Sequence, residues 1–171
     1  MILQNPGQCW RIYRENGDIA MEDNYCISVG CIVRKQDKVL LVRHTYGGAN
    51  RKLLIPGGYC NVGELPEEAA CREVLEETGV MAKVDGVLGI RCDRKTWYML
   101  MVMDHIKGEP KSDNNENSEV IFVNAQEAIG YDDVTHMTKV ALKTLLNKED
   151  RLLFPDLEYK KIRGNDYELY I

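Results

Sequence analysis

The sequence of 171 residues predicts one α/β domain at 25–148, with extensions at 1–24 and 149–171. Three observations lead to this prediction. Segments rich in β-branched residues alternate with segments whose apolar residues recur at helical spacing. The composition, with 44% hydrophobic and 29% charged residues, is that of a globular protein. No internal repeat or low-complexity linker divides the sequence, so a single core is the simplest arrangement.

The first strands are predicted from turn residues that lie between apolar runs. In the N-terminal extension, Asn16-Gly17 favours a type I′ turn, because both central residues of that turn need positive φ, so 1–24 is expected to form a hairpin. Residues 27–34 and 39–44 are apolar and β-branched, and a polar turn separates them. The short apolar segment 53–55 ends at a Pro-Gly-Gly sequence, which interrupts regular structure.

A helix is predicted over 66–78. Pro66 suits the first helical turn, and Gly79 suits the position just beyond the last residue. Apolar side chains repeat at a spacing of four, so one face is expected to pack against a sheet. That expected face consists of Ala70, Cys71, Val74 and Leu75.

The second half of the domain continues the alternation. Residues 83–91 and 97–105 are predicted strands around a polar turn, and 107–118 is a loop rich in Gly, Pro, Asp and Asn. Residues 119–123 form another predicted strand, and 135–146 have the apolar pattern of an amphipathic helix.

The cysteines and the lengths of the apolar runs indicate in which cellular compartment the protein is expected to lie. The six cysteines show no CxxC pair and no zinc-ligand spacing, and no secretory signal is visible at the N-terminus. The even count is compatible with disulfides, but the size, the apolar content and the lack of a visible signal favour reduced thiols and a cytoplasmic protein. The longest apolar run, 98–103, is far shorter than the roughly 18 residues of a membrane span, so no membrane partner is expected.

The net charge of −5 is concentrated in one segment, 58–80. This segment has six acidic residues and a single base, Arg72, whereas acids and bases balance in the rest of the chain. The acidic residues are Glu64, Glu67, Glu68, Glu73, Glu76 and Glu77. No basic patch of the size that nucleic-acid binding requires is visible, so no nucleic-acid partner is expected.

Three of these acids fall on one side of the predicted helix. Glu73, Glu76 and Glu77 have i, i+3 and i+4 spacing, and like charges at this spacing destabilise a helix unless something compensates them. Arg72 reaches Glu76 at i+4, but one guanidinium cannot neutralise three carboxylates. Hard cations such as Mg²⁺ or Mn²⁺ prefer oxygen ligands of this kind. The alternative is a solvated acidic face, as in an acidic-helix interaction protein.

The full spacing is more specific than the three glutamates alone. Gly58 is followed after five residues by Glu64, after seven more by Arg72-Glu73-Val74, and then by Glu76-Glu77 and Gly79-Val80 with one residue before each pair. The segment from Gly58 to Val80 resembles the box of the Nudix hydrolase family at every specified position. The resemblance implies a Nudix-like α/β/α sandwich with a mixed β-sheet.

The same resemblance implies an activity. Nudix hydrolases are pyrophosphatases that cleave, with Mg²⁺ or Mn²⁺, the pyrophosphate linkage in a nucleoside diphosphate joined to another moiety, so a small nucleotide or nucleotide-sugar derivative is the expected partner. The implied metal ligands are Glu73, Glu76, Glu77 and the backbone carbonyl of Gly58. The alternative within the family is a non-catalytic sensor that binds a nucleotide without cleaving it.

Further roles follow from the resemblance. Glu73 and Glu76 are expected to be catalytic as well as metal-binding, and Arg72 is expected to orient a box glutamate. The general base is either a box glutamate or a carboxylate of the loop 107–118, where Glu116 is the first candidate and Glu119, just beyond the loop, is the second.

Substrate recognition is less defined in the sequence. Arg43, Arg51 and Arg91 are candidates to pair with substrate phosphates, although each is equally compatible with plain surface charge. The extensions 1–24 and 149–171 are hypothesised to form a lid or the surface of a homodimer.

Overall fold

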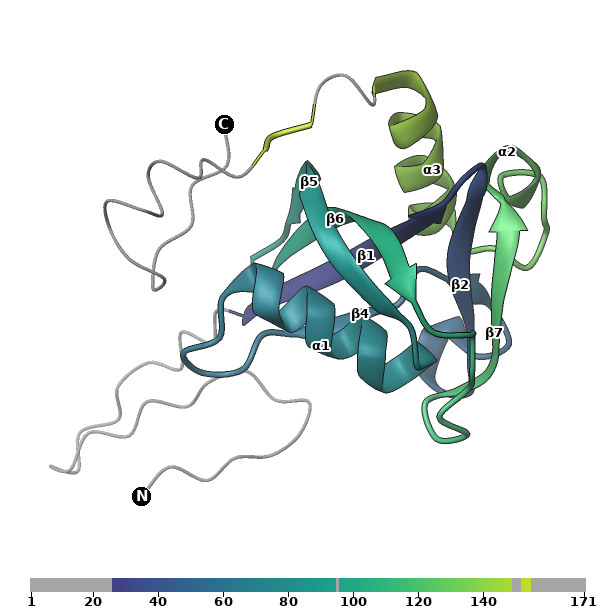
Figure 1. Ribbon diagram of the computed structural model, residues 1–171, viewed down its shortest axis with the longest axis horizontal. Helices are drawn as coiled ribbons and strands as arrows, with labels where there is room; N and C mark the ends of the chain where they lie inside the picture. The colour runs from purple at the N-terminus through teal and green to yellow at the C-terminus, as the bar shows by residue number, and fades with distance from the viewer. Residues whose placement is uncertain (1–25, 95, 149–151, 155–171) are drawn as a thin grey trace, which may run out of the picture.

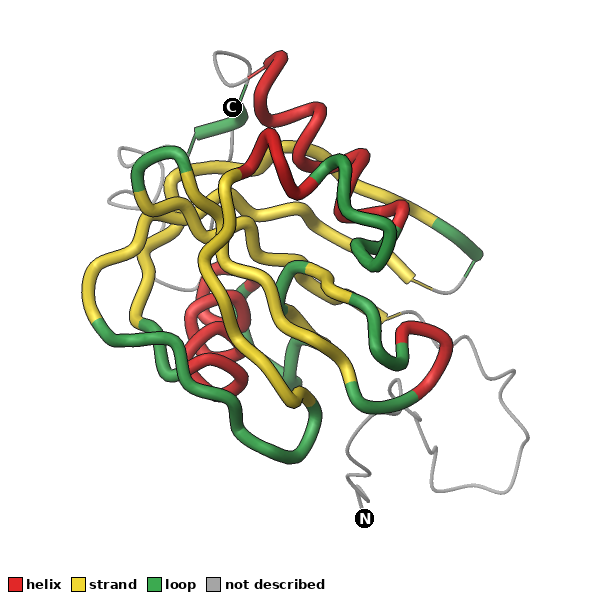
Figure 2. The backbone as a smooth tube through the Cα atoms, turned by 90° about the vertical axis from the view of Figure 1, so that its right-hand side faces the viewer, coloured by secondary structure: helices red, strands yellow, loops and turns green. Residues whose placement is uncertain are grey.

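The computed structural model describes residues 26–94, 96–148 and 152–154. A mixed sheet lies between helix α1 (Pro66–Thr78) on one face and helices α2 (Ala125–Ala128) and α3 (His136–Lys148) on the other, as Figures 1 and 2 show. This confirms the predicted α/β/α sandwich. The N-terminal hairpin and most of the C-terminal extension lie outside the described residues.

Seven strands build the sheet. They are β1 (Cys26–Lys35), β2 (Lys38–His44), β3 (Leu53–Leu54), β4 (Gly57–Tyr59), β5 (Met81–Cys92), β6 (Thr96–Lys107) and β7 (Asn117–Asn124), and a 3-10 turn spans Gly47–Ala49. Their order is β3-β2-β1-β6-β5, with β4 paired to β1 and β7 paired to β2. β1 and β6 are parallel and the other pairs are antiparallel.

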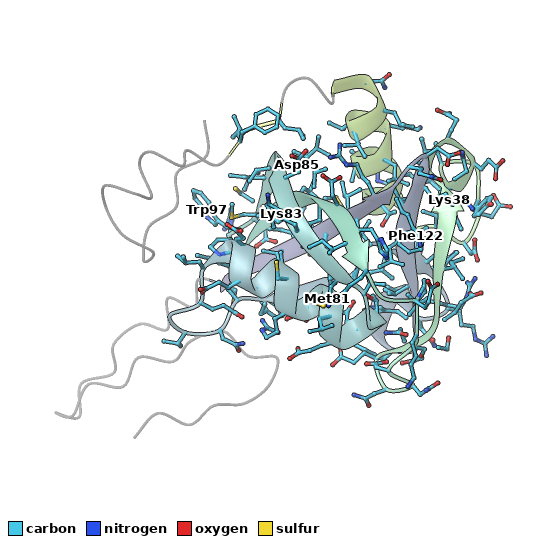
Figure 3. The ribbon with its side chains drawn as sticks, in the orientation of Figure 1. Lys38, Met81, Lys83, Asp85, Trp97 and Phe122 are labelled. Atoms are coloured by element: carbon cyan, nitrogen blue, oxygen red, sulfur yellow. The ribbon has the colours of Figure 1, made fainter. Side chains whose placement is uncertain are left out.

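Alternation along β1 divides its side chains between two cores. Val29 and Cys31 join the core beneath α1, whereas Ile32 joins the core beneath α3, because successive side chains of a strand point to opposite faces. Figure 3 shows Met81 and Trp97 at opposite ends of the β5–β6 pair, with α1 running alongside.

Helix α1 has the predicted bounds and ends at Gly79, whose φ of 67° is the left-handed conformation expected of a helix C-cap. The predicted buried face is wrong at Leu75, which is 48% exposed. The helix is rotated so that Ala69 joins Ala70 and Val74 in the core, and small side chains at 69 and 70 allow close approach to the sheet. This rotation also buries Glu77.

Two short segments pair with the sheet where no strand was predicted. Gly57–Tyr59 forms β4 against β1, although its sequence indicates only a turn. At the start of the C-terminal extension, Leu153 exchanges backbone hydrogen bonds of 2.9 and 3.0 Å with Val87 of β5, and Leu152 is buried in the core beneath α3.

The expectation of reduced thiols is wrong at Cys26. This residue, the first of β1, is disulfide-bonded, whereas Cys31, Cys60, Cys71 and Cys92 form no disulfide. The bond could not be predicted, because it depends on two cysteines meeting in the fold rather than on their spacing. Among the described residues, no helix is long and apolar enough to cross a membrane.

Candidate active site

The backbone of Gly57 brings α1 and β1 together at the start of the acidic segment. Gly57 has a φ of 154°, and a Cβ at this position would overlap the carbonyl oxygen of Val29. Only glycine can therefore lie this close to β1. From this position its N–H donates to Oε2 of Glu77 at 3.3 Å.

The three glutamates that were predicted to bind metal differ in burial. Glu77 is only 5% exposed, the side chain of Glu73 is 15% exposed, and that of Glu76 is 61% exposed. Burial, followed by the charge of Glu73, raises the pKa of Glu77 to about 8, although the Gly57 hydrogen bond opposes the change. Burial also raises the pKa of Glu73, although Arg72 opposes it. Burial therefore makes it costly for Glu73 and Glu77 to carry negative charge together.

Arg72 binds three of the carboxylates. Its guanidinium donates to both oxygens of Glu64 at 2.7 and 2.9 Å, to Glu73 at 2.7 Å and to Glu76 at 3.1 Å. It also donates to the carbonyl of Tyr59 in β4 at 3.0 Å. These contacts place Arg72 beside the acidic cluster, and its role in orienting a box glutamate stays a prediction.

Two other acidic residues of the segment accept hydrogen bonds from backbone N–H groups. Glu64 accepts a hydrogen bond of 2.7 Å from the N–H of Asn61, so it holds the loop before α1. Glu68 accepts one of 3.0 Å from the N–H of Leu65 and thereby caps the first turn of α1. The loop and the helix that carries the metal-ligand candidates are thus fixed together.

The donor set fits a hard divalent cation by chemistry. Glu73, Glu76 and Glu77 supply carboxylate oxygens, and a deprotonated Glu77 would be poorly solvated, because burial is the main cause of its raised pKa. Over residues 26–94, 96–148 and 152–154, no three acidic, histidine or cysteine side chains already converge as a ligand group. Arg72 contacts one carboxylate oxygen of Glu73 and one of Glu76, and the second oxygen of each carboxylate makes no contact with it.

Gly58 lies directly against Glu73. A Cβ at Gly58 would overlap the Glu73 carboxylate, which is the movable end of its side chain. We expect Gly58→Ala to displace this carboxylate, leave the fold intact and weaken Mn²⁺ binding by about tenfold or more, the usual cost of misplacing a ligand. Titration followed by Mn²⁺ electron paramagnetic resonance measures this effect.

The matched control is Gly48→Ala, because nothing lies within 4 Å of a Cβ at Gly48. It should bind Mn²⁺ as the wild type does. Unchanged Mn²⁺ affinity in Gly58→Ala would contradict a ligand role for Glu73.

Glu116 is the last residue of the loop before β7, and its charge affects two carboxylates of the box. Besides burial, which is the main cause in each case, the charge of Glu116 contributes to the raised pKa of both Glu73 and Glu77. Glu116 thus lies within electrostatic range of two of the box carboxylates, as a base acting at this site must. By contrast, Glu119 binds Arg43 through a salt bridge of 2.7 Å.

Two of the arginines predicted to bind substrate have protein partners. Arg43 donates at 2.7 Å to Glu119, at 2.7 Å to Asp133 and at 3.1 Å to the carbonyl of Arg51, so it ties β2 to β7 and to the segment before α3. Arg91 lies over the ring of Tyr98, 4.9 Å from its centroid. Arg51 itself is exposed and has a φ of 63°.

The sequence reasoning missed three residues around Glu116. They are Tyr46, whose hydroxyl donates to Glu116, and Asp113 and Asn117, which organise its loop. The side chain of Asn117 is buried and donates to the carbonyl of Glu77 at 2.8 Å, which connects the loop to α1. An Asp in a loop rich in Asn is a turn signal that could have indicated Asp113, but no local signal indicates Tyr46.

The sequence is similar to those of known proteins. The chain is 31% identical over 113 residues to an ADP-ribose pyrophosphatase of Methanocaldococcus jannaschii, covering 62% of this chain and 67% of that protein. It is 34% identical over 96 residues to the NAD-capped RNA hydrolase NudC of Vibrio cholerae, covering 55% of this chain but only 35% of that protein.

The fold is also similar to that of solved structures. A NUDIX hydrolase from Nitrosomonas europaea superimposes with a TM-score of 0.65 at 23% identity, over 75% of this chain and 74% of that one. The family model of the NUDIX domain matches residues 24–145, which is more than half of the sequence. The chain therefore belongs to the Nudix hydrolase family.

Proposed function

We propose that this protein hydrolyses, with a divalent metal ion, the pyrophosphate linkage of a nucleoside diphosphate joined to another moiety. One observation carries the proposal: two poorly solvated carboxylates, Glu73 and Glu77, lie beside the more exposed Glu76 on α1, against the backbone of Gly57 and Gly58. Such a group has a clear use in binding cations and little use in stabilising a helix.

Glu73, Glu76 and Glu77, with the backbone carbonyl of Gly58, would hold Mg²⁺ or Mn²⁺. When bound, such an ion screens the phosphate oxygens, stabilises the leaving oxygen and lowers the pKa of water. Arg72 contributes by holding Glu73 and Glu76 on the same side of α1.

Glu116 is the proposed general base. It takes a proton from a water molecule that attacks one phosphorus, while the bond from that phosphorus to the bridging oxygen breaks and the bridging oxygen leaves with the other phosphate. The products are two phosphate-bearing fragments, or a nucleotide and pyrophosphate. With Glu73, Glu76 and Arg72, this completes the proposed catalytic set.

ADP-ribose is the first substrate to test, because the relative from Methanocaldococcus jannaschii is named for it. Arg51 and Arg91 are proposed to meet the substrate's phosphates, and Arg43 joins them only if it releases a carboxylate partner. The cytoplasmic location and the homodimer stay predictions.

We expect purified protein to hydrolyse at least one member of a panel of ADP-ribose, NADH, a dinucleoside polyphosphate, a nucleotide sugar and coenzyme A. Hydrolysis should require Mg²⁺ or Mn²⁺ and stop with EDTA, since the carboxylates alone would repel the substrate. Phosphate-bearing products are measured by ion-pair chromatography. Saturable binding of a panel member without cleavage would instead identify a non-catalytic nucleotide sensor.

A further inference from the structure

The side chain of Glu116 contacts Tyr46, which lies two residues beyond the end of β2. We propose that Tyr46 is a positioning residue, whose hydroxyl fixes the Glu116 carboxylate for proton transfer. The inference rests on the proposed function, in which Glu116 is the base. The main observation that supports it is a hydrogen bond of 3.2 Å from the Tyr46 hydroxyl to Oε2 of Glu116.

The backbone of Glu116 is fixed by other contacts. The carboxylate of Asp113 accepts hydrogen bonds of 3.0 to 3.2 Å from the N–H groups of Asn115, Glu116 and Asn117. The N–H of Thr45 donates to the carbonyl of Glu116 at 3.1 Å, and its hydroxyl donates to the same carbonyl at 3.0 Å. The loop is thus anchored to the end of β2 without any help from the Glu116 side chain.

The carboxylate of Glu116 has a different anchor. Within the described part of the chain, the Tyr46 hydroxyl is the one group that hydrogen-bonds it. A glutamate side chain has three rotatable bonds, so a fixed backbone does not by itself fix its carboxylate. Removing the hydroxyl would leave the loop in place and release the carboxylate.

The environment of Tyr46 suits a donor. Its ring lies 5.0 Å from that of His44, with an interplanar angle of 30°, which restrains the ring. Burial, followed by the charge of Glu116, raises the pKa of Tyr46 to about 12, so the hydroxyl keeps its proton at neutral pH. The side chain is nevertheless 51% exposed, which is not expected of a tyrosine kept for core packing.

The exposed ring has an alternative use as a stacking surface for a substrate base. The two roles depend on different parts of the side chain. Positioning needs the hydroxyl, which Tyr46→Phe removes, whereas stacking needs the ring, which Tyr46→Phe keeps and Tyr46→Leu removes.

The first experiment is kinetic. We expect Tyr46→Phe to lower kcat roughly tenfold with KM unchanged, because a poorly placed base loses part of its rate contribution. Glu116→Gln should lower kcat by about 100-fold or more, and the double variant should be no slower than Glu116→Gln. Tyr131→Phe, which changes an exposed tyrosine outside the site, should match the wild type.

The second experiment needs no activity. In metal-free protein labelled with ¹³C, the side-chain carboxyl resonance of Glu116, identified by its loss in Glu116→Gln, should move in Tyr46→Phe but not in Tyr131→Phe. The melting temperature should change by only a few degrees, since one exposed hydrogen bond contributes little to folding.

Three results would overturn the positioning role: full kcat in Tyr46→Phe with a raised KM in Tyr46→Leu, multiplied losses in the double variant, or an unmoved Glu116 resonance. If the wild type cleaves no substrate, the proposed function fails, and the resonance alone decides whether Tyr46 holds Glu116.

Discussion

Replacing Glu76 by glutamine is expected to lower kcat by about 1,000-fold, which corresponds to roughly 4 kcal/mol of lost transition-state stabilisation. The amide keeps the size of the side chain but removes the charge that would attract a divalent cation. Folding should be almost unaffected, because the side chain is 61% exposed and its ion pair with Arg72 is largely in solvent. Steady-state kinetics at saturating Mg²⁺, together with thermal melting, separate the two effects.

Glu68→Gln is the matched control for this variant. Glu68 lies on the same helix, and glutamine can still accept the hydrogen bond from the N–H of Leu65. It should therefore keep kcat within a factor of about two. A Glu76→Gln enzyme that retained more than a tenth of the wild-type kcat would exclude Glu76 as a required metal ligand.

The parts of the fold that could be predicted depend on local sequence. Helix α1 has its predicted bounds because Pro66 and Gly79 act through their own backbone conformations. The same holds for the strands on either side of the Lys35–Lys38 turn. The Nudix box is also local, so the identity and helical spacing of its glutamates could be read directly.

The parts that could not be predicted depend on contacts between distant segments. The hydrogen bond from Tyr46 to Glu116 joins residues 70 positions apart, and that from Arg43 to Asp133 joins residues 90 apart. Both require the register of β2 against β7 and the path of the following loops. For this reason, the sequence could not predict that Arg43 links β2 to β7 and to the segment before α3.

The burial of Glu77 could not be predicted either, because it too depends on contacts between distant segments. Its place on the helix follows from spacing, but its exposure depends on how α1 is rotated against the sheet, and that rotation is set by Ala69 and Ala70 rather than by Leu75. The sequence therefore predicts three similar glutamates, whereas the fold makes one of them a buried acid with its own pH dependence.

Metal-free protein is expected to lose stability as the pH rises from about 4.5 to about 8. Because the folded pKa of Glu77 is about 8 and its ordinary value is 4.5, the folded state holds more protons than the unfolded state in this window. Stability then falls as the pH rises, by up to about 5 kcal/mol. Melting in EDTA across this range measures the change.

Glu77→Gln should remove most of this dependence. Its neutral amide resembles the protonated acid and can still accept the hydrogen bond from Gly57. At pH 8 the metal-free variant should therefore melt above the wild type, by on the order of 10 °C. His44, whose pKa burial lowers, gives a change of opposite sign below about pH 6.5, but it is present in both proteins and cancels in the comparison.

Divalent metal should reverse the slope in the wild type alone. A ligand carboxylate must lose its proton to bind the ion, so Mn²⁺ binds more tightly as the pH rises and stabilises the folded state more. At pH 8, saturating Mn²⁺ should raise the melting temperature of the wild type and have much less effect on Glu77→Gln. If the two metal-free proteins showed the same pH dependence, Glu77 would not be the group whose raised pKa lowers the stability of the folded protein as the pH rises. If the expected slope appeared but Mn²⁺ stabilised both proteins equally, Glu77 would be buried without being a ligand.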